Sequence, residues 1–272
     1  MFRWRLLTAL IGAPLMLGAL WRGGAWWGAI LAAIAVWGAL ELGDLFVAKG
    51  AGQPQRDVLI CAGLAGFLMA PALESLAATR WVALVGLLLP TTAFAYAALR
   101  AWARGASVLL EASAAVFAFS YVGVLMGFWW LLRSPGPDGW HHALLALLGT
   151  WGTDVLAYST GKLMGRRRLL PRVSPGKTVE GAVGGLAGGV GTVVGVGSLA
   201  LGLPAWWTLG LGVVVALAAE LGDLAESALK RDANVKDSGW LLPGHGGILD
   251  RMDSALVTGL AAYLWTLLVS RP

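Results

Sequence analysis

The stretch from Trp206 to Asp253 decides the fold, because it passes in one run from apolar helix to charged loop: WWTLGLGVVVALAAELGDLAESALKRDANVKDSGWLLPGHGGILDRMD. Its first half is apolar over about the 20 residues that a helix needs to cross a bilayer. Its second half, from Ser227 onward, gathers carboxylates, cations, a histidine and glycines. Charged groups at a membrane are expensive, so such a cluster indicates a functional site. We call residues 227–253 the polar segment.

Similar apolar runs recur along the whole chain. The 272 residues are 58% hydrophobic and 13% charged, whereas soluble domains carry about 25% charged residues. We therefore predict an all-α fold, a polytopic membrane helical bundle of about nine transmembrane helices. The expected spans are residues 6–20, 25–45, 58–76, 81–99, 114–132, 143–161, 181–203, 206–229 and 248–269. Within this one membrane unit, we expect scaffold helices in residues 1–133 and a catalytic region in residues 134–272.

The basic residues are distributed unevenly over the connections between spans. With the N-terminus in the cytoplasm, most of the 20 Lys and Arg residues lie on the cytoplasmic side, as the positive-inside rule requires. The exceptions are Arg22, Arg80, Arg133 and Arg271. This distribution explains the net charge of +5 without a nucleic-acid partner and places the polar segment at the cytoplasmic face. The N-terminus resembles a signal peptide, but many spans follow, so we expect the first helix to be retained.

The polar side chains of this segment follow helical spacing. Asp223, Ser227 and Lys230 are four and three residues apart, so they line one face of a helix. Asp250 and Asp253 are three apart and share a face of the next helix. Carboxylate oxygens of this type suit Mg²⁺, which is usually held by one or two carboxylates together with substrate phosphates. The sequence therefore predicts a magnesium-dependent site for a phosphorylated substrate.

The loop between these two helices supplies further polar groups. Gly246 and Gly247 permit close approach of the backbone to a ligand, and amides at the start of the following helix can bind an oxyanion. His245 is expected to orient a phosphate or to support a metal ligand; the alternative is a hydrogen-bonded loop histidine. Lys236 and Asp237 lie in the same loop.

A second group of candidates lies upstream. Asp154 and Tyr158 are one helical turn apart, and a basic loop ends in SPGKTVEG at residues 174–181. Lys177 in this loop either neutralises a phosphate, which we favour, or contacts anionic lipid headgroups. The glycines spaced four apart between residues 181 and 195 predict close packing of helix backbones in lipid.

The acids of the first half are expected to be interfacial groups or to form hydrogen bonds in helix packing. The alternative is a remote contribution to a site, for which the best candidates are Glu41 and Asp44, because they share a helix face. Cys61 is the only cysteine, so an internal disulfide and a cysteine metal cluster are excluded.

The polar segment resembles the phosphatidate cytidylyltransferase family, also called CDP-diacylglycerol synthase. The family signature is S-x-hydrophobic-K-R, four residues, K-D-x-small, two residues, hydrophobic-[PG]-x-H-G-G-hydrophobic-x-D-R-hydrophobic-D, and residues 227–253 meet every specified position. Upstream, Asp154, Ala157, Tyr158, Gly161 and the motif at 174–181 also look like family motifs. Gly176 departs from the pattern, because a second lysine is common there.

The resemblance implies that the chain transfers the cytidylyl group from CTP to phosphatidate, giving CDP-diacylglycerol and pyrophosphate for phospholipid biosynthesis. It implies a homodimeric integral membrane enzyme with Mg²⁺ and room for a second cation such as K⁺. The compact chain favours a bacterial inner membrane, with the active site facing the cytoplasm. The expected metal ligands are Asp223, Asp250 and Asp253.

The remaining site residues fall into two sets. Those expected to act in catalysis are Asp223, Lys230, Arg231, Lys236, Asp237, His245, Asp250, Arg251 and Asp253. Those expected to bind substrate are Asp154, Tyr158, Ser174, Lys177, Thr178, Glu180, Ser227, Gly246 and Gly247. One alternative is a related reaction, such as that of a CTP-dependent lipid kinase or of a synthase that uses ether lipids. The other is a transporter, because intramembrane acids also mark ion pathways; no internal repeat supports it.

Overall fold

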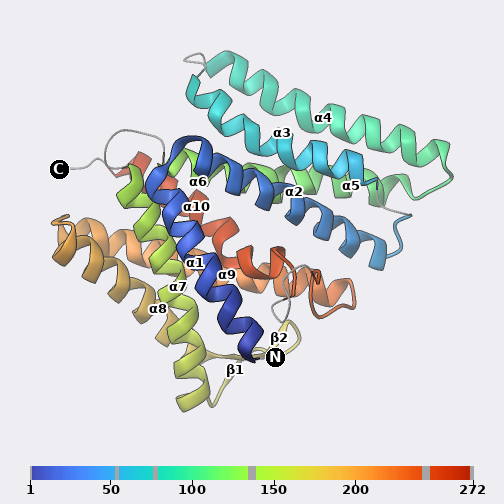
Figure 1. Cartoon of the computed structure of the whole chain (residues 1–272). Coiled ribbons are helices and arrows are strands. Elements are labelled where there is room, and N and C mark those ends of the chain that lie inside the picture. The colour runs from blue at the N-terminus through green and yellow to red at the C-terminus, as the bar shows by residue number, and fades with distance from the viewer. Residues whose placement is uncertain (1, 53–54, 76–78, 134–138, 241–245, 270–272) are drawn as a thin grey trace. The chain divides into compact units, whose positions relative to one another are not determined.

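A computed structural model describes residues 2–52, 55–75, 79–133, 139–240 and 246–269 of the chain (Figure 1). The regular secondary structure of these ranges is helical apart from one short hairpin. The first helices are α1 (Phe2–Arg22), α2 (Gly24–Ala48), α3 (Arg56–Ser75), α4 (Thr79–Ala103), α5 (Val108–Phe117) and α6 (Leu125–Arg133), with the π-helical segment η1 (Ala118–Val124) joining α5 to α6. They are followed by α7 (Gly139–Met164), α8 (Val179–Val194) with its π-helical extension η2 (Gly195–Ala200), α9 (Ala205–Asp232) and α10 (Leu249–Leu268).

The helical class predicted from the apolar runs is confirmed. Most expected spans fall on one helix, whereas residues 114–132 cover the end of α5, all of η1 and most of α6. Four helical segments of the described ranges are long and apolar enough to cross a membrane. They are Gly24–Ala48, Val108–Arg133, Val179–Ala200 and Ala205–Asp232. The figure of about nine transmembrane helices stays a prediction.

The basic loop before α8 differs from the expectation, because part of it forms a β-hairpin. Strands β1 (Arg168–Leu170) and β2 (Ser174–Thr178) pair antiparallel, with Arg168 opposite Thr178 and Leu170 opposite Ser174. The amide of Val173 closes the turn by donating to the carbonyl of Leu170 at 3.1 Å. Strands this short carry no readable alternation of polar and apolar residues, so the sequence pattern did not indicate them.

The chain divides into two compact units. The first unit comprises Met1–Leu131 and Leu229–Met252; the second comprises Leu132–Ala228 and Asp253–Pro272. Helices α9 and α10 therefore each contribute to both units. Most of the polar segment belongs to the same unit as the N-terminal helices. The functional division into scaffold and catalytic region stays a prediction.

Close backbone contacts hold the first unit together. A Cβ atom added to Gly66 of α3 would overlap the carbonyl oxygen of Phe119 in η1, and one added to Gly123 would lie 2.9 Å from the Cα of Gly66. Only glycine permits such an approach of two helices. The buried indole of Trp27 in α2 donates to the carbonyl of Trp129 in α6 at 3.2 Å. The first unit is thus joined between α3 and η1 and between α2 and α6.

In the second unit, the glycine-rich α8 packs along α7. A Cβ atom on Gly185 would lie 3.1 Å from the carbonyl oxygen of Thr153, and one on Gly188 would lie 2.7 Å from that of Gly152. The predicted packing role of the glycines is confirmed in this part of the helix. It does not extend to Gly191, because an added Cβ there meets no atom within 4 Å.

Candidate functional site

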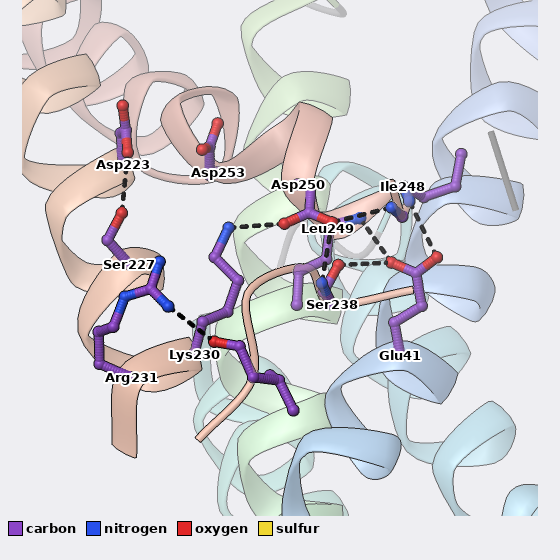
Figure 2. Close-up of polar contacts among 12 residues, drawn as sticks. Glu41, Asp223, Ser227, Lys230, Arg231, Ser238, Ile248, Leu249, Asp250 and Asp253 are labelled. Atoms are coloured by element: carbon purple, nitrogen blue, oxygen red, sulfur yellow. Dashed lines mark hydrogen bonds and ion pairs between the residues drawn. The ribbon is translucent and has the colours of Figure 1, made fainter. Parts of the chain in front are cut away.

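Asp250, at the start of α10, is the centre of a buried polar network in the first unit (Figure 2). Its Oδ1 accepts a hydrogen bond from the ammonium of Lys230 at 2.6 Å. Its Oδ2 accepts from the backbone amides of Ser238 and Gly247, both at 2.8 Å. Lys230 and Asp250 are only 8% and 9% exposed. A buried ion pair contributes little net stability unless its groups are well bonded, and here the carboxylate has three partners.

The backbone before α10 is shaped around this carboxylate. Gly246 has a φ of 82°, a conformation that other residues rarely adopt. A Cβ atom at this position would also lie 2.6 Å from Oδ2 of Asp250. Gly246 therefore meets both a conformational and a steric requirement. Since the Gly247 amide already donates to Asp250, an oxyanion could bind that amide only by displacing the carboxylate.

A second carboxylate, that of Glu41 in α2, enters the same network (Figure 2). Glu41 is 5% exposed. Its Oε1 accepts from the amide of Ile248 at 2.9 Å, and its Oε2 accepts from the amide of Leu249 at 2.8 Å and from the hydroxyl of Ser238 at 3.1 Å. Of the two acids considered for a remote contribution, Glu41 thus contacts the polar segment, whereas Asp44 is exposed.

The remaining predicted catalytic residues of the first unit lie at its surface. Lys236, Asp237 and Arg251 are exposed. Arg231 is also exposed, and its guanidinium donates to the carbonyl of Val235 at 3.0 Å. The prediction for His245 falls outside the described residues. The structure therefore joins Lys230 and Asp250 directly and leaves several cations accessible to a solute.

Asp223 belongs to the second unit and has a lysine of its own. The ammonium of Lys177, carried by β2, lies 2.8 Å from Oδ2 of Asp223. The hydroxyl of Ser227, one turn further along α9, donates to Oδ1 at 3.2 Å (Figure 2). The helical spacing placed Asp223, Ser227 and Lys230 on one helix face. The structure joins the first two by a hydrogen bond, whereas Lys230 pairs with Asp250. The spacing gave no indication of Lys177. The hairpin absent from the sequence prediction brings this lysine to the acid.

Two further acids lie near Asp223 within the second unit. Asp154 of α7 accepts a hydrogen bond from Ser254 of α10 at 3.2 Å and interacts electrostatically with Asp223, Glu220 and Lys177. One carboxylate oxygen of Glu220 is buried and has no hydrogen-bond partner among the described residues. Three carboxylates facing one lysine leave an excess of negative charge. Such a group attracts a cation.

The residues of β2 and of the start of α8 that were predicted to bind substrate have structural contacts. Thr178 caps α8, since its hydroxyl accepts from the amide of Gly181 at 3.0 Å. Glu180 accepts from the amides of Arg166 and Arg167 at 2.9 and 3.1 Å. Ser174 is half-buried. These bonds fix the start of α8 and thereby the position of β2.

Tyr158 lies on α7, one turn after Asp154, and is 70% exposed. The ammonium of Lys162 lies 5.8 Å from the centre of its ring, within the range of a cation–π interaction. Asp253 is half-buried, and its Oδ1 accepts from the amide of the neighbouring Ser254 at 2.7 Å. Substrate and metal roles for these residues stay predictions.

The carboxylate oxygens around Asp223 suit a hard divalent cation, although the described side chains do not by themselves form a complete coordination site. The described residues contain no group of three His, Cys, Asp or Glu side chains arranged to hold a metal ion. Mg²⁺ does not require such a group, because it usually keeps several waters and binds one or two carboxylates plus phosphates. The unpartnered oxygen of Glu220 and the excess of acids around Asp223 fit this mode of binding.

Sequence reasoning missed Ser238 and Ser254, each of which bonds a candidate acid. Ser238 falls at an unspecified position of the signature, and Ser254 lies 100 residues from Asp154 in the sequence. A hydroxyl is common at helix ends and in loops, so no local pattern distinguishes these two serines. Their roles depend on contacts between distant segments.

Comparison with known proteins gives one family match and several relatives. Residues 3–269 match the Cytidylyltransferase family. The chain is 43% identical over 148 residues to a phosphatidate cytidylyltransferase of Staphylococcus aureus (strain COL), covering 53% of this chain and 55% of the relative. It is 32% identical over 294 residues to a phosphatidate cytidylyltransferase of Synechocystis sp., covering 97% of this chain and 96% of the relative. The chain thus spans about half the length of the staphylococcal relative and nearly all of the cyanobacterial one.

Proposed function

The chain belongs to the cytidylyltransferase family, and from this premise we propose that it transfers the cytidylyl group of CTP to phosphatidate. The products would be CDP-diacylglycerol and pyrophosphate. The observation that carries the proposal is the buried Lys230–Asp250 pair in the segment that meets the family signature. Because taking two charges out of water is costly, a buried ion pair in a chain with few charges supports work on a charged substrate.

The proposed reaction needs little covalent help from the protein. A phosphate oxygen of phosphatidate attacks the α-phosphorus of CTP, the new P–O bond forms, and the bond to the bridging oxygen breaks as pyrophosphate leaves with the electron pair. The attacking phosphate is already largely ionised at neutral pH, so no strong general base is required. Catalysis would rest on positioning and on stabilisation of charge.

Cations are needed because both substrates are anionic. We assign the phosphates of CTP and phosphatidate to Lys230, Arg231, Lys236 and Arg251, with Asp237 and His245 in supporting roles. Three of these cations are exposed at the surface of the first unit and can turn towards a triphosphate. Lys230 would do so by leaving Asp250. We assign substrate binding to two further sets of residues. In the second unit they are Asp154, Tyr158, Ser174, Lys177, Thr178, Glu180 and Ser227, and in the first unit they are Gly246 and Gly247.

Magnesium dependence is part of the proposal, with Asp223, Asp250 and Asp253 as ligands and K⁺ as an optional second cation. Bound Mg²⁺ would neutralise phosphate charge and polarise the phosphoryl oxygens. In the structure, Lys177 and Lys230 supply the counter-charges of Asp223 and Asp250. We further propose a homodimer in a bacterial inner membrane, with the site open to the cytoplasm for CTP and to the bilayer for the acyl chains.

The position of a radioactive label tests this reaction directly. Purified protein in vesicles that contain phosphatidate is supplied with Mg²⁺ and with CTP labelled at either the α- or the γ-phosphorus. We expect α-label in the lipid product and γ-label in pyrophosphate. Transfer of γ-label to lipid would indicate a CTP-dependent lipid kinase, and a preference for ether-linked acceptors would indicate the other synthase reaction. No incorporation of either label by folded protein would contradict the proposal.

A further inference from the structure

We infer that Glu41 of α2 is a positioning residue, which holds the start of α10 and thereby the carboxylate of Asp250. The inference deepens the proposed function and rests on it, since Asp250 is assigned there to catalysis. All the contacts that support it lie within the first unit. Glu41 lies in one of the helices that the sequence assigned to the scaffold.

The two carboxylates share one set of backbone groups. Three consecutive amides precede or begin α10: that of Gly247 donates to Asp250, and those of Ile248 and Leu249 donate to Glu41. Ser238 joins both acids, because its amide donates to Asp250 and its hydroxyl to Glu41. A shift of the Glu41 carboxylate would therefore move the groups that orient Asp250 (Figure 2).

The start of α10 needs a partner from elsewhere in the chain. Its first residue is Leu249, and the preceding residue, Ile248, has no side-chain atom that can accept a hydrogen bond. Helix starts usually satisfy their free amides with Ser, Thr, Asp or Asn at that position. Glu41 supplies the acceptor from α2 instead, and its negative charge suits the positive end of the helix dipole.

Two of the residues that surround the Glu41 carboxylate are glycines, and a side chain at either position would overlap it. A Cβ atom on Gly239 would lie 2.6 Å from Oε1 of Glu41, and one on Gly247 would lie 2.5 Å from its Cδ. Lys49, the residue directly after α2, donates to the carbonyl and carboxylate of Asp232, the last residue of α9, at 3.0 and 2.7 Å. Helix α2 and the residue after it thus contact both ends of the segment that joins α9 to α10.

Glu41→Gln is the most informative change because it keeps the shape and removes one acceptor. Both carboxylate oxygens accept from backbone amides, so the amide group of glutamine must face a donor in either orientation. Losing a hydrogen bond to a charged group corresponds to about a ten- to hundredfold effect. We expect kcat to fall by about that factor, while KM for CTP changes by less than about threefold.

Hydrogen exchange separates positioning from general stability. In Glu41→Gln, amides of residues 246–253 should exchange faster, while amides at the α3–η1 contact should exchange as in the wild type. The matched control is Asp44→Asn, which makes the same charge change on an exposed acid of the same helix and should leave both exchange and kcat unchanged. Wild-type kcat together with wild-type exchange in Glu41→Gln would overturn the inference.

A second variant keeps the test decisive if Glu41→Gln does not fold. Ser238→Ala removes one hydroxyl bond to Glu41 and leaves the Ser238 amide free to donate to Asp250. It should accelerate exchange over residues 246–253 in the same direction, with a smaller loss of kcat; unchanged exchange would overturn the inference. If the wild type made no CDP-diacylglycerol, the proposed function would fail, whereas the exchange data would still report on the role of Glu41.

Discussion

A methyl group at Gly247 should loosen the start of α10 without unfolding the protein. In Gly247→Ala, the added Cβ would lie 2.5 Å from the hydroxyl of Ser238 and 2.5 Å from Cδ of Glu41, whereas ordinary contacts begin at 3.4 Å. These groups must therefore move apart by about 0.9 Å. Overpacking of this kind costs about 1–3 kcal/mol, and losing a hydrogen bond to a carboxylate costs about 1.5–3 kcal/mol.

The smallest combined effect is about 2.5 kcal/mol, which corresponds to about a sixtyfold increase in local opening. Hydrogen exchange of residues 246–253 in detergent measures this opening, and CDP-diacylglycerol formation should fall in parallel. Gly18→Ala is the matched control, because a Cβ at Gly18 meets no atom within 4 Å. Exchange and activity at the wild-type level in Gly247→Ala would refute the account of this network.

Two further changes test the buried contacts of the first unit. Lys230→Met leaves the Asp250 carboxylate buried without its counter-charge, which typically costs about 3–5 kcal/mol of stability. The two amides that remain bonded to Asp250 favour the lower end of this range. An unchanged denaturant midpoint would contradict the buried Lys230–Asp250 pair. Gly66→Ala places a methyl group on the carbonyl oxygen of Phe119 and should destabilise the unit by about 1–3 kcal/mol. Thermal unfolding beside Gly18→Ala measures this effect, and equal midpoints would show that α3 and η1 can separate freely.

Helical structure was predictable because apolar length and helical spacing are local properties. The run from Trp206 identified α9, and the four-residue spacing of Asp223 and Ser227 placed both on one helix face, where the structure joins them by a hydrogen bond. The close packing of α8 on α7 was likewise readable from the glycine spacing. In each case the prediction depends on the spacing of residues within one helix. For α8 these residues are also small enough to let a second helix approach closely.

The partners of the key acids were harder to predict because they come from distant segments. Lys177 reaches Asp223 from a hairpin too short to show alternation, and Glu41 reaches Ile248 across 207 positions of sequence. Helical spacing placed Glu41 and Asp44 on one face, yet only Glu41 is buried. Which of two neighbouring acids faces a partner depends on the packing of α2, and a single sequence does not contain that information.

The measurement that tests the central claim most directly is CDP-diacylglycerol formation by purified protein in phosphatidate vesicles, titrated with Mg²⁺, with Asp250→Asn alongside. Asparagine keeps the volume of the side chain but places a donor against either Lys230 or the two backbone amides. We expect magnesium-dependent product and stoichiometric pyrophosphate from the wild type and almost none from the variant, with both proteins folded in detergent. Equal turnover by the two proteins, or no turnover by folded wild type, would contradict the account.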